Sequence, residues 1–276
     1  MERFILKIIL AFSLLSSKGL TQEIQRCTGS DCNAPKCSNF EGITLDYPFD
    51  PIPQNYTGMV KLCFTSGHIA QINEYLNGKQ NGISYAYHPD LSIAKKAKYQ
   101  DGNQLGEEVQ FWHGGIVMSK CEYKQNKKNG LEFLYNPEGK LTEKNIYFND
   151  EKNGVCIEYF QNGQVSTQTN YSMGLREGEQ IAYYENGRFK LKCKHSKDKT
   201  EGILVAYFDN TENTIMGEIT YVDGLENGKL LKFHENGIKE CEGNMMNGKK
   251  HGVWVYYFES GEVQATREYL DGKRIK

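Results

Sequence analysis

The residue types that most often carry catalysis or metal binding are present, but their spacing gathers no site. The six histidines are spread over the chain: His68, His88, His113, His195, His234 and His251. No two come together with carboxylates at metal-ligand spacing. No glycine-rich turn opens a helix as a phosphate loop does, and no serine sits in a nucleophile elbow. We therefore expect no catalytic residues, no metal and no cofactor, and a protein that is not an enzyme.

The eight cysteines form two groups. Cys121 and Cys193 are three units apart in a 24-residue period that runs through the chain, roughly 29 Å at the strand spacing of a sheet. A disulfide needs Cα atoms within about 7 Å. We expect four free thiols, at Cys121, Cys156, Cys193 and Cys241. The cysteines that can gather near the N-terminus are candidates for two disulfides of open connectivity, with a zinc site as the alternative: Cys27, Cys32, Cys37 and Cys63.

The period is marked by a glycine. Gly58 is followed after 24 residues by Gly82, and the same interval gives Gly106, Gly130, Gly154, Gly178 and Gly202, then Gly228 after 26 residues and Gly252 after 24. A fixed period of this size indicates a repeat architecture, in which each unit is one supersecondary element packed on its neighbours. Positions are counted below from this period glycine as zero.

Each period begins with a predicted strand. Position three is apolar nearly throughout, position one often is, and position four is mixed, which favours alternation between an apolar face and a wetter one. Position five is aromatic in eight units: Tyr87, Phe111, Tyr135, Tyr159, Tyr183, Tyr207, Phe233 and Tyr257.

A second strand follows a turn. It opens on Ile69, Ile93, Val117, Leu141, Val165, Phe189 and Val263, and a two-residue insertion at 210–213 brings Ile215 into the same column. Position seventeen is a second aromatic column: Tyr75, Tyr99, Tyr123, Tyr147, Tyr171, Tyr221 and Tyr269. The aromatics recur every second strand, so we expect them to form ladders along one face, roughly 10 Å apart, with a structural or an interaction role.

Turn residues separate the strands. The pairs Asn162-Gly163, Asn186-Gly187 and Asn236-Gly237 follow the first strand. Asn-Gly tolerates positive φ at both central positions of a turn, so these pairs are predicted to close a two-stranded hairpin. Gly-Lys turns such as Gly78-Lys79 lead to the next period. The predicted fold is all-β: an elongated antiparallel meander of about nine β-hairpin repeats of 24 residues and about eighteen strands.

The N-terminal residues differ from the repeats in composition and residue order. Residues 1–22 place Arg3 and Lys7 before the apolar run Ile8–Leu15 and then small residues, the order of a secretory signal peptide. Residues 23–55 contain three cysteines and four prolines and are predicted to form an irregular leader and cap, and residues 56–276 the repeat array. Sequons for glycosylation stand at Asn55 and Asn170.

The residues resemble a known family. Gly252–Gly261 followed by Tyr269–Lys273, and Gly178–Gly187, are similar to the MORN-repeat variant of YwqK-type bacterial proteins over about residues 56–276. The resemblance implies a MORN-like single-sheet solenoid. It also implies binding rather than catalysis, and it supplies no catalytic residues. An antitoxin label is attached broadly to that family.

Function is therefore expected to be binding. The leading hypothesis is a non-enzymatic scaffold for an unidentified protein partner, secreted, periplasmic or at the cell surface. The alternatives are a glycan- or envelope-binding module and a YwqK-like antitoxin or immunity protein. The balance of 33 basic and 35 acidic residues gives no footprint for nucleic acid. The chain is not expected to be transmembrane, because the apolar run is too short. The last strand can recruit a second copy of the chain.

Overall fold

The computed structural model describes residues 24–25, 52, 54–63 and 69–276. Contacts divide the chain into two compact units. The described residues up to Met118, with Glu122–Lys127, form unit 1, and Ser119–Cys121 with Lys128–Lys276 form unit 2. The expected signal peptide, Cys27, Cys32 and Cys37 lie outside the described residues, as does the Cys63 side chain.

Unit 1 contains the first three repeats. Its short strand β1 (Ile24–Gln25) pairs in parallel with β2, at the start of the array. The remaining strands follow in chain order: β2 (Gly58–Cys63), β3 (Ile69–Leu76), β4 (Lys79–Gln80), β5 (Gly82–Tyr87), β6 (Ile93–Gln100), β7 (Asn103–Gln104) and β8 (Gly106–Phe111), with β9 (Val117–Lys124) contributing residues to both units.

Unit 2 contains the last six repeats. Its strands are β10 (Lys127–Tyr135), β11 (Leu141–Phe148), β12 (Glu151–Lys152), β13 (Gly154–Tyr159), β14 (Val165–Ser172), β15 (Leu175–Tyr183), β16 (Phe189–Ser196), β17 (Lys199–Tyr207), β18 (Ile215–Val222), β19 (Leu225–Phe233), β20 (Lys239–Met246), β21 (Lys249–Tyr257), β22 (Val263–Leu270) and β23 (Lys273–Arg274).

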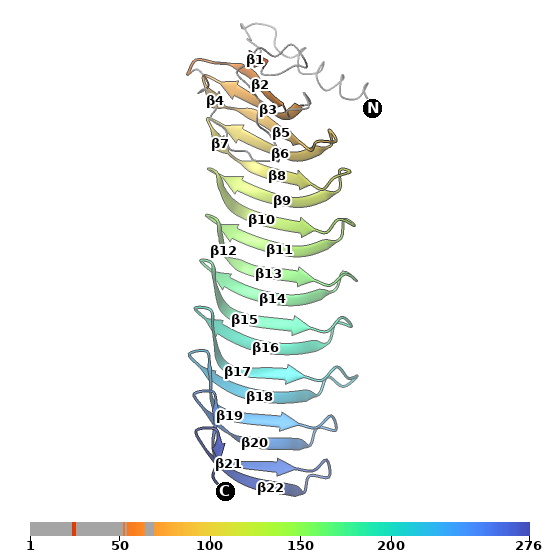
Figure 1. Cartoon of the computed structure of the whole chain (residues 1–276), viewed down its shortest axis with the longest axis vertical. Helices are drawn as coiled ribbons and strands as arrows, with labels where there is room; N and C mark the ends of the chain where they lie inside the picture. The colour runs from red at the N-terminus through yellow and green to blue at the C-terminus, as the bar shows by residue number, and fades with distance from the viewer. Residues whose placement is uncertain (1–23, 26–51, 53, 64–68) are drawn as a thin grey trace. The chain divides into compact units, whose positions relative to one another are not determined.

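Apart from the parallel pair of β1 and β2, the strands within each unit pair antiparallel in a meander (Figure 1). The fold class predicted from the sequence is confirmed. The second strands open at the predicted residues, for example β14 at Val165 and β16 at Phe189. The two-residue insertion lengthens one hairpin loop, where Phe208 N donates to Thr214 O. In the part of the chain that the structure describes, no helix is long and apolar enough to span a bilayer.

Positive φ at both central residues is found in the turns after the second strand of each repeat, as at Asn247 and Gly248, and not at the Asn-Gly pairs. The turns after the second strand are the two-residue hairpins. At Asn162-Gly163 only the glycine has positive φ, and Phe160 N donates to Gln164 O while Gly163 N donates to Phe160 O. That pattern is a three-residue loop closed by a glycine bulge. The Asn-Gly pairs therefore close hairpins as predicted, but positive φ at both central residues is not found there.

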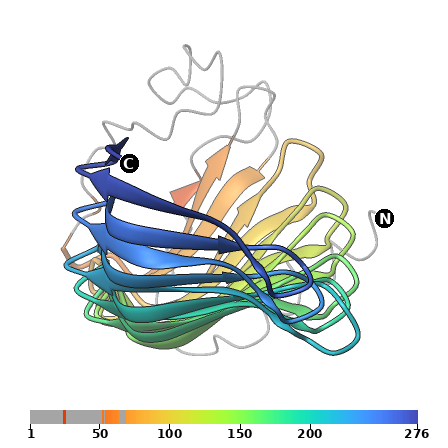
Figure 2. The ribbon, with the colours of Figure 1, turned by 90° about the horizontal axis from the view of Figure 1, so that it is seen from below.

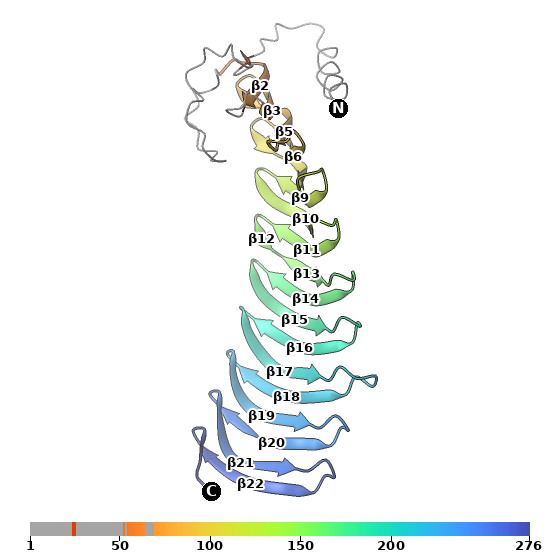
Figure 3. The same cartoon turned by 45° about the vertical axis from the view of Figure 1, so that its right-hand side comes forward.

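The asparagine of this loop connects neighbouring repeats instead. Asn162 Oδ1 accepts from Gln164 N within its own loop, and Asn162 Nδ2 donates to Glu185 O in the next loop. Asn236 repeats both bonds, with Ile238 N and Glu259 O. Its side chain therefore holds the loops in line along one margin of unit 2, which Figure 3 shows as a row of hairpin ends.

The period glycine marks a bulge in the first strand. Gly178 has a φ of 95°, and pairing to the preceding strand slips between Thr169↔Gln180 and Tyr171↔Arg176. A Cβ at Gly178 would stand 3.2 Å from Asn170 Nδ2. Glycine is required because the backbone is left-handed and the preceding strand is close. The strands of unit 2 bend, as the end-on view shows (Figure 2).

In the strands of unit 2 the buried side chains lie on one face. We call it the inner face; in the third repeat of unit 2 it carries Gln180, Leu191 and Cys193, while Glu179, Ile181 and Tyr183 lie on the outer face. Apart from Trp254, its buried residues at positions two and fifteen are small or polar, namely Cys121, Glu132, Asn145, Cys156, Thr169 and Cys193. In unit 1 the same positions are buried at Ser84, Ala97 and Glu108.

The expectation that positions one, three and five form the more buried, apolar face is therefore wrong. Ile203 and Val253, both at position one, are 58% and 55% exposed. In a single-layer sheet nothing covers either face, so side chains are buried only where the sheet bends and brings them together. Crowding on the inner face decides burial, and side-chain polarity does not.

Trp254 is the largest fully buried side chain of the described residues. Its indole lies over Gly243, where an added Cβ would overlap the ring, and its Nε1 donates to Asn244 O at 3.2 Å. The Lys250 ammonium lies 4.2 Å from the ring centroid. The indole of Trp254 therefore packs against Gly243 and lies close to the Lys250 ammonium.

Gly243→Ala should lower the free energy of unfolding by about 1–3 kcal/mol, because the new methyl group displaces the indole. Urea denaturation followed by tryptophan fluorescence measures the change. In a Trp254→Leu background the same substitution should cost clearly less, since the smaller side chain leaves room. Equal costs in the two backgrounds would show that the indole does not occupy this place.

Candidate functional site

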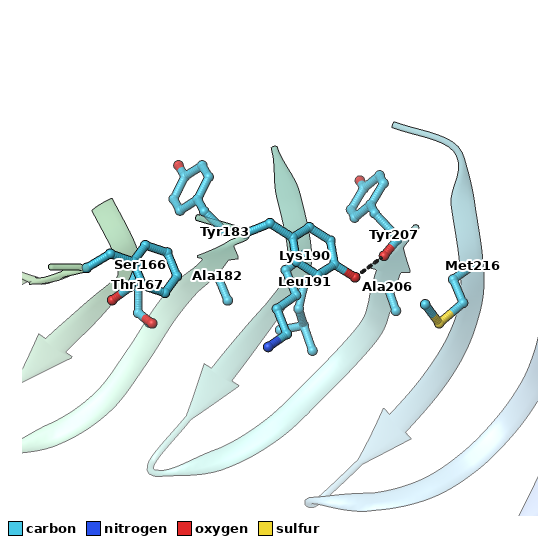
Figure 4. A pocket seen from close by; sticks show the side chains of 11 residues that line it. Ser166, Thr167, Ala182, Tyr183, Lys190, Leu191, Ala206, Tyr207 and Met216 are labelled. Carbon is cyan, nitrogen blue, oxygen red and sulfur yellow. Dashed lines mark hydrogen bonds between the residues drawn. The ribbon is translucent and has the colours of Figure 1, made fainter. Parts of the chain in front are cut away.

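A groove lies on the inner face of unit 2, over β14 to β18. Its volume is about 380 Å³. Ala182 and Ala206, both at position four, are among its lining residues. Leu191, on the strand between them, is the Cα partner of both. Short side chains at position four in two successive repeats leave space above the sheet. Figure 4 shows this row pointing away from the rings of Tyr183 and Tyr207.

Aromatic side chains at position six also line the groove. Phe160 and Tyr184 belong to successive repeats. Tyr184 Oη donates to Tyr207 O at 2.8 Å, the dashed bond in Figure 4, so its ring is fixed. His88 and His234, also at position six, contact the same carbonyl of the next repeat through Nε2, at 2.9 Å from Phe111 O and 3.1 Å from Tyr257 O. Position six is therefore a structural link between repeats that also presents rings to the groove.

Polar lining residues stand beside the apolar ones. Ser166, Thr167 and Lys190 line the groove, together with Met216. A ligand here would meet an apolar surface with a few hydroxyl groups and one ammonium.

The two predicted aromatic columns do not share a face. Position seventeen pairs with the period glycine, as in Gly154↔Tyr171. Position five lies five residues further along the same strand as that glycine and pairs with position eleven, as in Tyr159↔Val165. Because side chains alternate, these columns lie on opposite faces. Tyr269 accordingly contacts Trp254 on the inner face, with ring centroids 6.2 Å apart.

The position-five column is packed on the outer face. Phe189 stands between Tyr183 and Tyr207, with centroid distances of 5.6 and 5.8 Å. Lys192 Nζ lies 3.3 Å from the Phe189 centroid. Tyr257 Oη donates to Glu242 Oε1 at 2.7 Å. These contacts give the outer column a structural role in holding repeats together.

His195 replaces tyrosine in the inner column and lies beside a thiol. Its Nε2 is 2.7 Å from Gln180 Oε1 and 3.5 Å from Cys193 Sγ. Its Nδ1 is buried without a hydrogen-bond partner. Burial raises the pKa of Cys193 and, together with the nearby Arg176, lowers the pKa of His195. A neutral thiol beside a neutral imidazole is a poor nucleophile.

Two histidines do meet, against expectation. The rings of His88 and His113 stack with centroids 4.0 Å apart, and His113 Nδ1 lies 3.3 Å from Asp90 Oδ2. The hairpin loops of neighbouring repeats bring positions six and seven together, which spacing along the chain hides. Hydrogen bonds from Ser92, and then from His113, lower the pKa of Asp90 to about 2. Across the described residues, no three potential ligands gather to hold a metal.

The repeat cysteines are free, as predicted. Cys121, Cys156, Cys193 and Cys241 are buried on the inner face and form no disulfide. The groove residues were not predicted. The run of alanines at position four, Ala182 then Ala206, is the signal in the sequence that could have located them.

Comparison with known proteins identifies the class of repeat. The sequence profile of the MORN repeat variant family matches residues 152–173 and 250–271. Both segments occupy the same phase of the period, from two residues before the glycine to nineteen after it. These two units are thus MORN repeat variants. No curated protein matches the chain.

Solved structures give weak similarity. A crystal structure of a TcdB2–TccC3–Cdc42 complex aligns with 78% of this chain and 14% of that chain, at 9% identity and a TM-score of 0.22. A Photorhabdus luminescens Tc holotoxin pore aligns with 75% of this chain and 14% of that chain, at 9% identity and a TM-score of 0.17. The chain therefore spans about one seventh of the length of these proteins.

His195 should make stability depend on pH. Its pKa is lower in the folded chain than its ordinary value of 6.5, so below that pH the unfolded chain binds more protons. The free energy of unfolding should therefore be greatest above about pH 6.5, where His195 is neutral in both states, and should fall as the pH drops. Urea denaturation from pH 7.5 to 5 measures this, and His195→Gln should flatten the slope. A ring titration by NMR with its midpoint above 6.5 would contradict the prediction.

Proposed function

We propose that this protein is a non-enzymatic binding scaffold that holds an extended polypeptide partner along the inner face of unit 2. The groove over β14 to β18 carries the proposal. It lies on the face where side chains converge, and its long direction crosses the strands, so several repeats contribute to one contact surface. Repeat proteins commonly bind through such extended surfaces.

The chemistry of the groove supports a polypeptide. Ala182, Leu191, Ala206 and Met216 offer apolar contact, and Ser166 and Thr167 offer hydroxyl groups for main-chain amides. The fixed ring of Tyr184 costs little conformational entropy on binding. Aromatic rings also stack on sugars, so a glycan is the competing ligand in the test.

The non-catalytic part of the proposal rests on chemistry as well. The Cys193–His195 pair has the composition of a nucleophilic dyad, but burial holds the thiol in its neutral form. The resemblance to YwqK-type proteins also favours binding. An antitoxin role is a special case of the same proposal, in which the polypeptide partner is a toxin.

Photo-crosslinking tests the groove directly. A benzophenone amino acid at Ala206 in the full chain should crosslink one dominant polypeptide in extracts of the source cells. The same probe at Glu179, which is exposed on the outer face, should not. Ala182→Arg fills the groove and should weaken capture about tenfold or more. Equal capture at both positions, or capture of glycan alone, would overturn the proposal.

Export is a second part of the proposal, supported by the charged, apolar and small-residue order of residues 1–22. Expression of the full chain in the source organism should give a mature N-terminus between Gly19 and Gln22, read by mass spectrometry, in the periplasm, in the medium or at the cell surface. An intact Met1 on the cytoplasmic protein would contradict it. A Leu10→Arg variant interrupts the apolar run and should block processing.

A further inference from the structure

The inner face of unit 2 carries unpaired positive charge at one end. Lys250 Nζ lies 5.3 Å from the Tyr256 centroid and 5.2 Å from that of Tyr269, and donates to Tyr256 Oη at 2.9 Å. The Arg267 guanidinium lies 4.7 Å from the Tyr256 centroid. Tyr256 Oη and Tyr269 Oη are 3.2 Å apart. Two cations therefore share one pair of phenols.

No carboxylate balances these cations among the described residues, since none of the ion pairs formed there includes Lys250 or Arg267. The exposed Lys232 adds a third positive charge, because it is the Cα partner of Cys241, which in turn pairs with Tyr256. A hydrogen bond from Tyr256 lowers the pKa of Tyr269, and a hydrogen bond from Arg267 and the charge of Lys250 act in the same direction.

The other end of the same face carries two carboxylates that form no ion pair in the part of the chain that the structure describes, and one lysine, Lys152, lies over the Tyr171 ring there at 5.4 Å. Glu143 and Glu158 are direct Cα partners on β11 and β13. Like charges placed opposite each other repel. Asn145 Nδ2 donates to Glu143 Oε2 and to Glu132 Oε2, both at 3.1 Å, but only Glu132 has a cation, Lys128. Within the described residues, Glu143 and Glu158 form no ion pair.

The apolar groove lies between these two ends. From β13 to β21 the meander contains eight strand steps, roughly 38 Å at the usual strand spacing. An extended peptide of about twelve residues covers that length. In chain order, the inner face of unit 2 thus presents the opposed pair Glu143 and Glu158, then the apolar groove with its hydroxyl groups and Lys190, then Lys250 and Arg267.

We infer that the partner segment is bipolar: basic side chains over Glu143 and Glu158, small or apolar side chains in the groove, and acidic side chains over Lys250 and Arg267. This rests on the proposed function and adds the chemistry and the orientation of the ligand. The arginine presents a planar donor edge to a carboxylate, and the phenols of Tyr256 and Tyr269 add hydroxyl donors.

An anionic membrane or a polyphosphate fits this face less well. Either would gain at Lys250 and Arg267 but meet Glu143 and Glu158 at the other end, where like charges repel. A polypeptide can carry opposite charges at its two ends, so it satisfies both clusters at once. Charge complementarity along the whole face therefore selects a polypeptide.

Four synthetic peptides of about twelve residues test the inference by calorimetry on the full chain. All share one apolar centre; their ends carry lysines and glutamates, lysines only, glutamates only, or no charge. The bipolar peptide should bind about tenfold more tightly than the uncharged one, as charge pairs at an interface permit. Vesicles of phosphatidylserine and phosphatidylcholine are the competing probe, and co-sedimentation with them but no peptide preference would overturn the inference.

Charge reversal sharpens the test. Glu143→Lys with Glu158→Lys should make the glutamate-only peptide the tightest ligand, and Lys250→Glu with Arg267→Glu should favour the lysine-only peptide. Lys232→Glu is the second variant at the cationic end, chosen because its exposed side chain does not cover Trp254. Lys192→Glu on the outer face is the matched control and should change no preference.

The outcomes separate the two proposals. Equal binding of all four peptides, blocked by Ala182→Arg, would overturn the bipolar ligand and leave the groove as a polypeptide site. A preference unchanged by every charge reversal would do the same. Absence of binding by any peptide, with no polypeptide crosslinked at Ala206, would overturn both.

Discussion

The constraint on which this fold depends is that a single-layer sheet has no second layer to bury its side chains. Burial is possible only where the sheet bends enough for its own side chains to meet. The period glycine allows this bend, because a left-handed residue at a bulge lets the first strand of each repeat turn against the preceding strand. The recurrence of that glycine, more than any apolar pattern, defines the unit.

Bending explains which residues end up inside. Asn145 and Glu132 are buried on the inner face and bonded to each other, while valine and isoleucine at position one remain exposed on the outer face. Glu108 shows how such burial is tolerated: burial raises its pKa, but hydrogen bonds from Gln110 and Gln104 and the charge of Lys95 outweigh it, and its pKa ends below the ordinary value. Buried polar groups here are paired by neighbours on the same face.

The same geometry creates the groove that is proposed to bind a partner. Where position four is small, as at Ala182 and Ala206, the inner face opens into a groove; where it is large, as at Tyr256, the face is filled. A repeat array can thus vary one position without disturbing the strand pairing or the loop asparagines that join its units. Charge varies in the same way, because Glu158 and Lys232 occupy that position in other repeats. In the proposed function, the side chains at position four set the ligand specificity, and the strand pairing of the repeats stays the same.

The sequence by itself determined the period, the strand pairs, the strand starts and the free thiols, because these follow from local spacing and from distances along a regular array. It did not determine which face is buried, since alternation shows only that two faces differ. Tertiary structure decided that the columns at Tyr171 and Tyr159 lie on opposite sides, and that Asn162 bonds the next repeat instead of forming a two-residue turn. It also decided the groove and its charged ends. The physical reason is that bending and register bring together residues 24 or more positions apart, and no local pattern records how closely they meet.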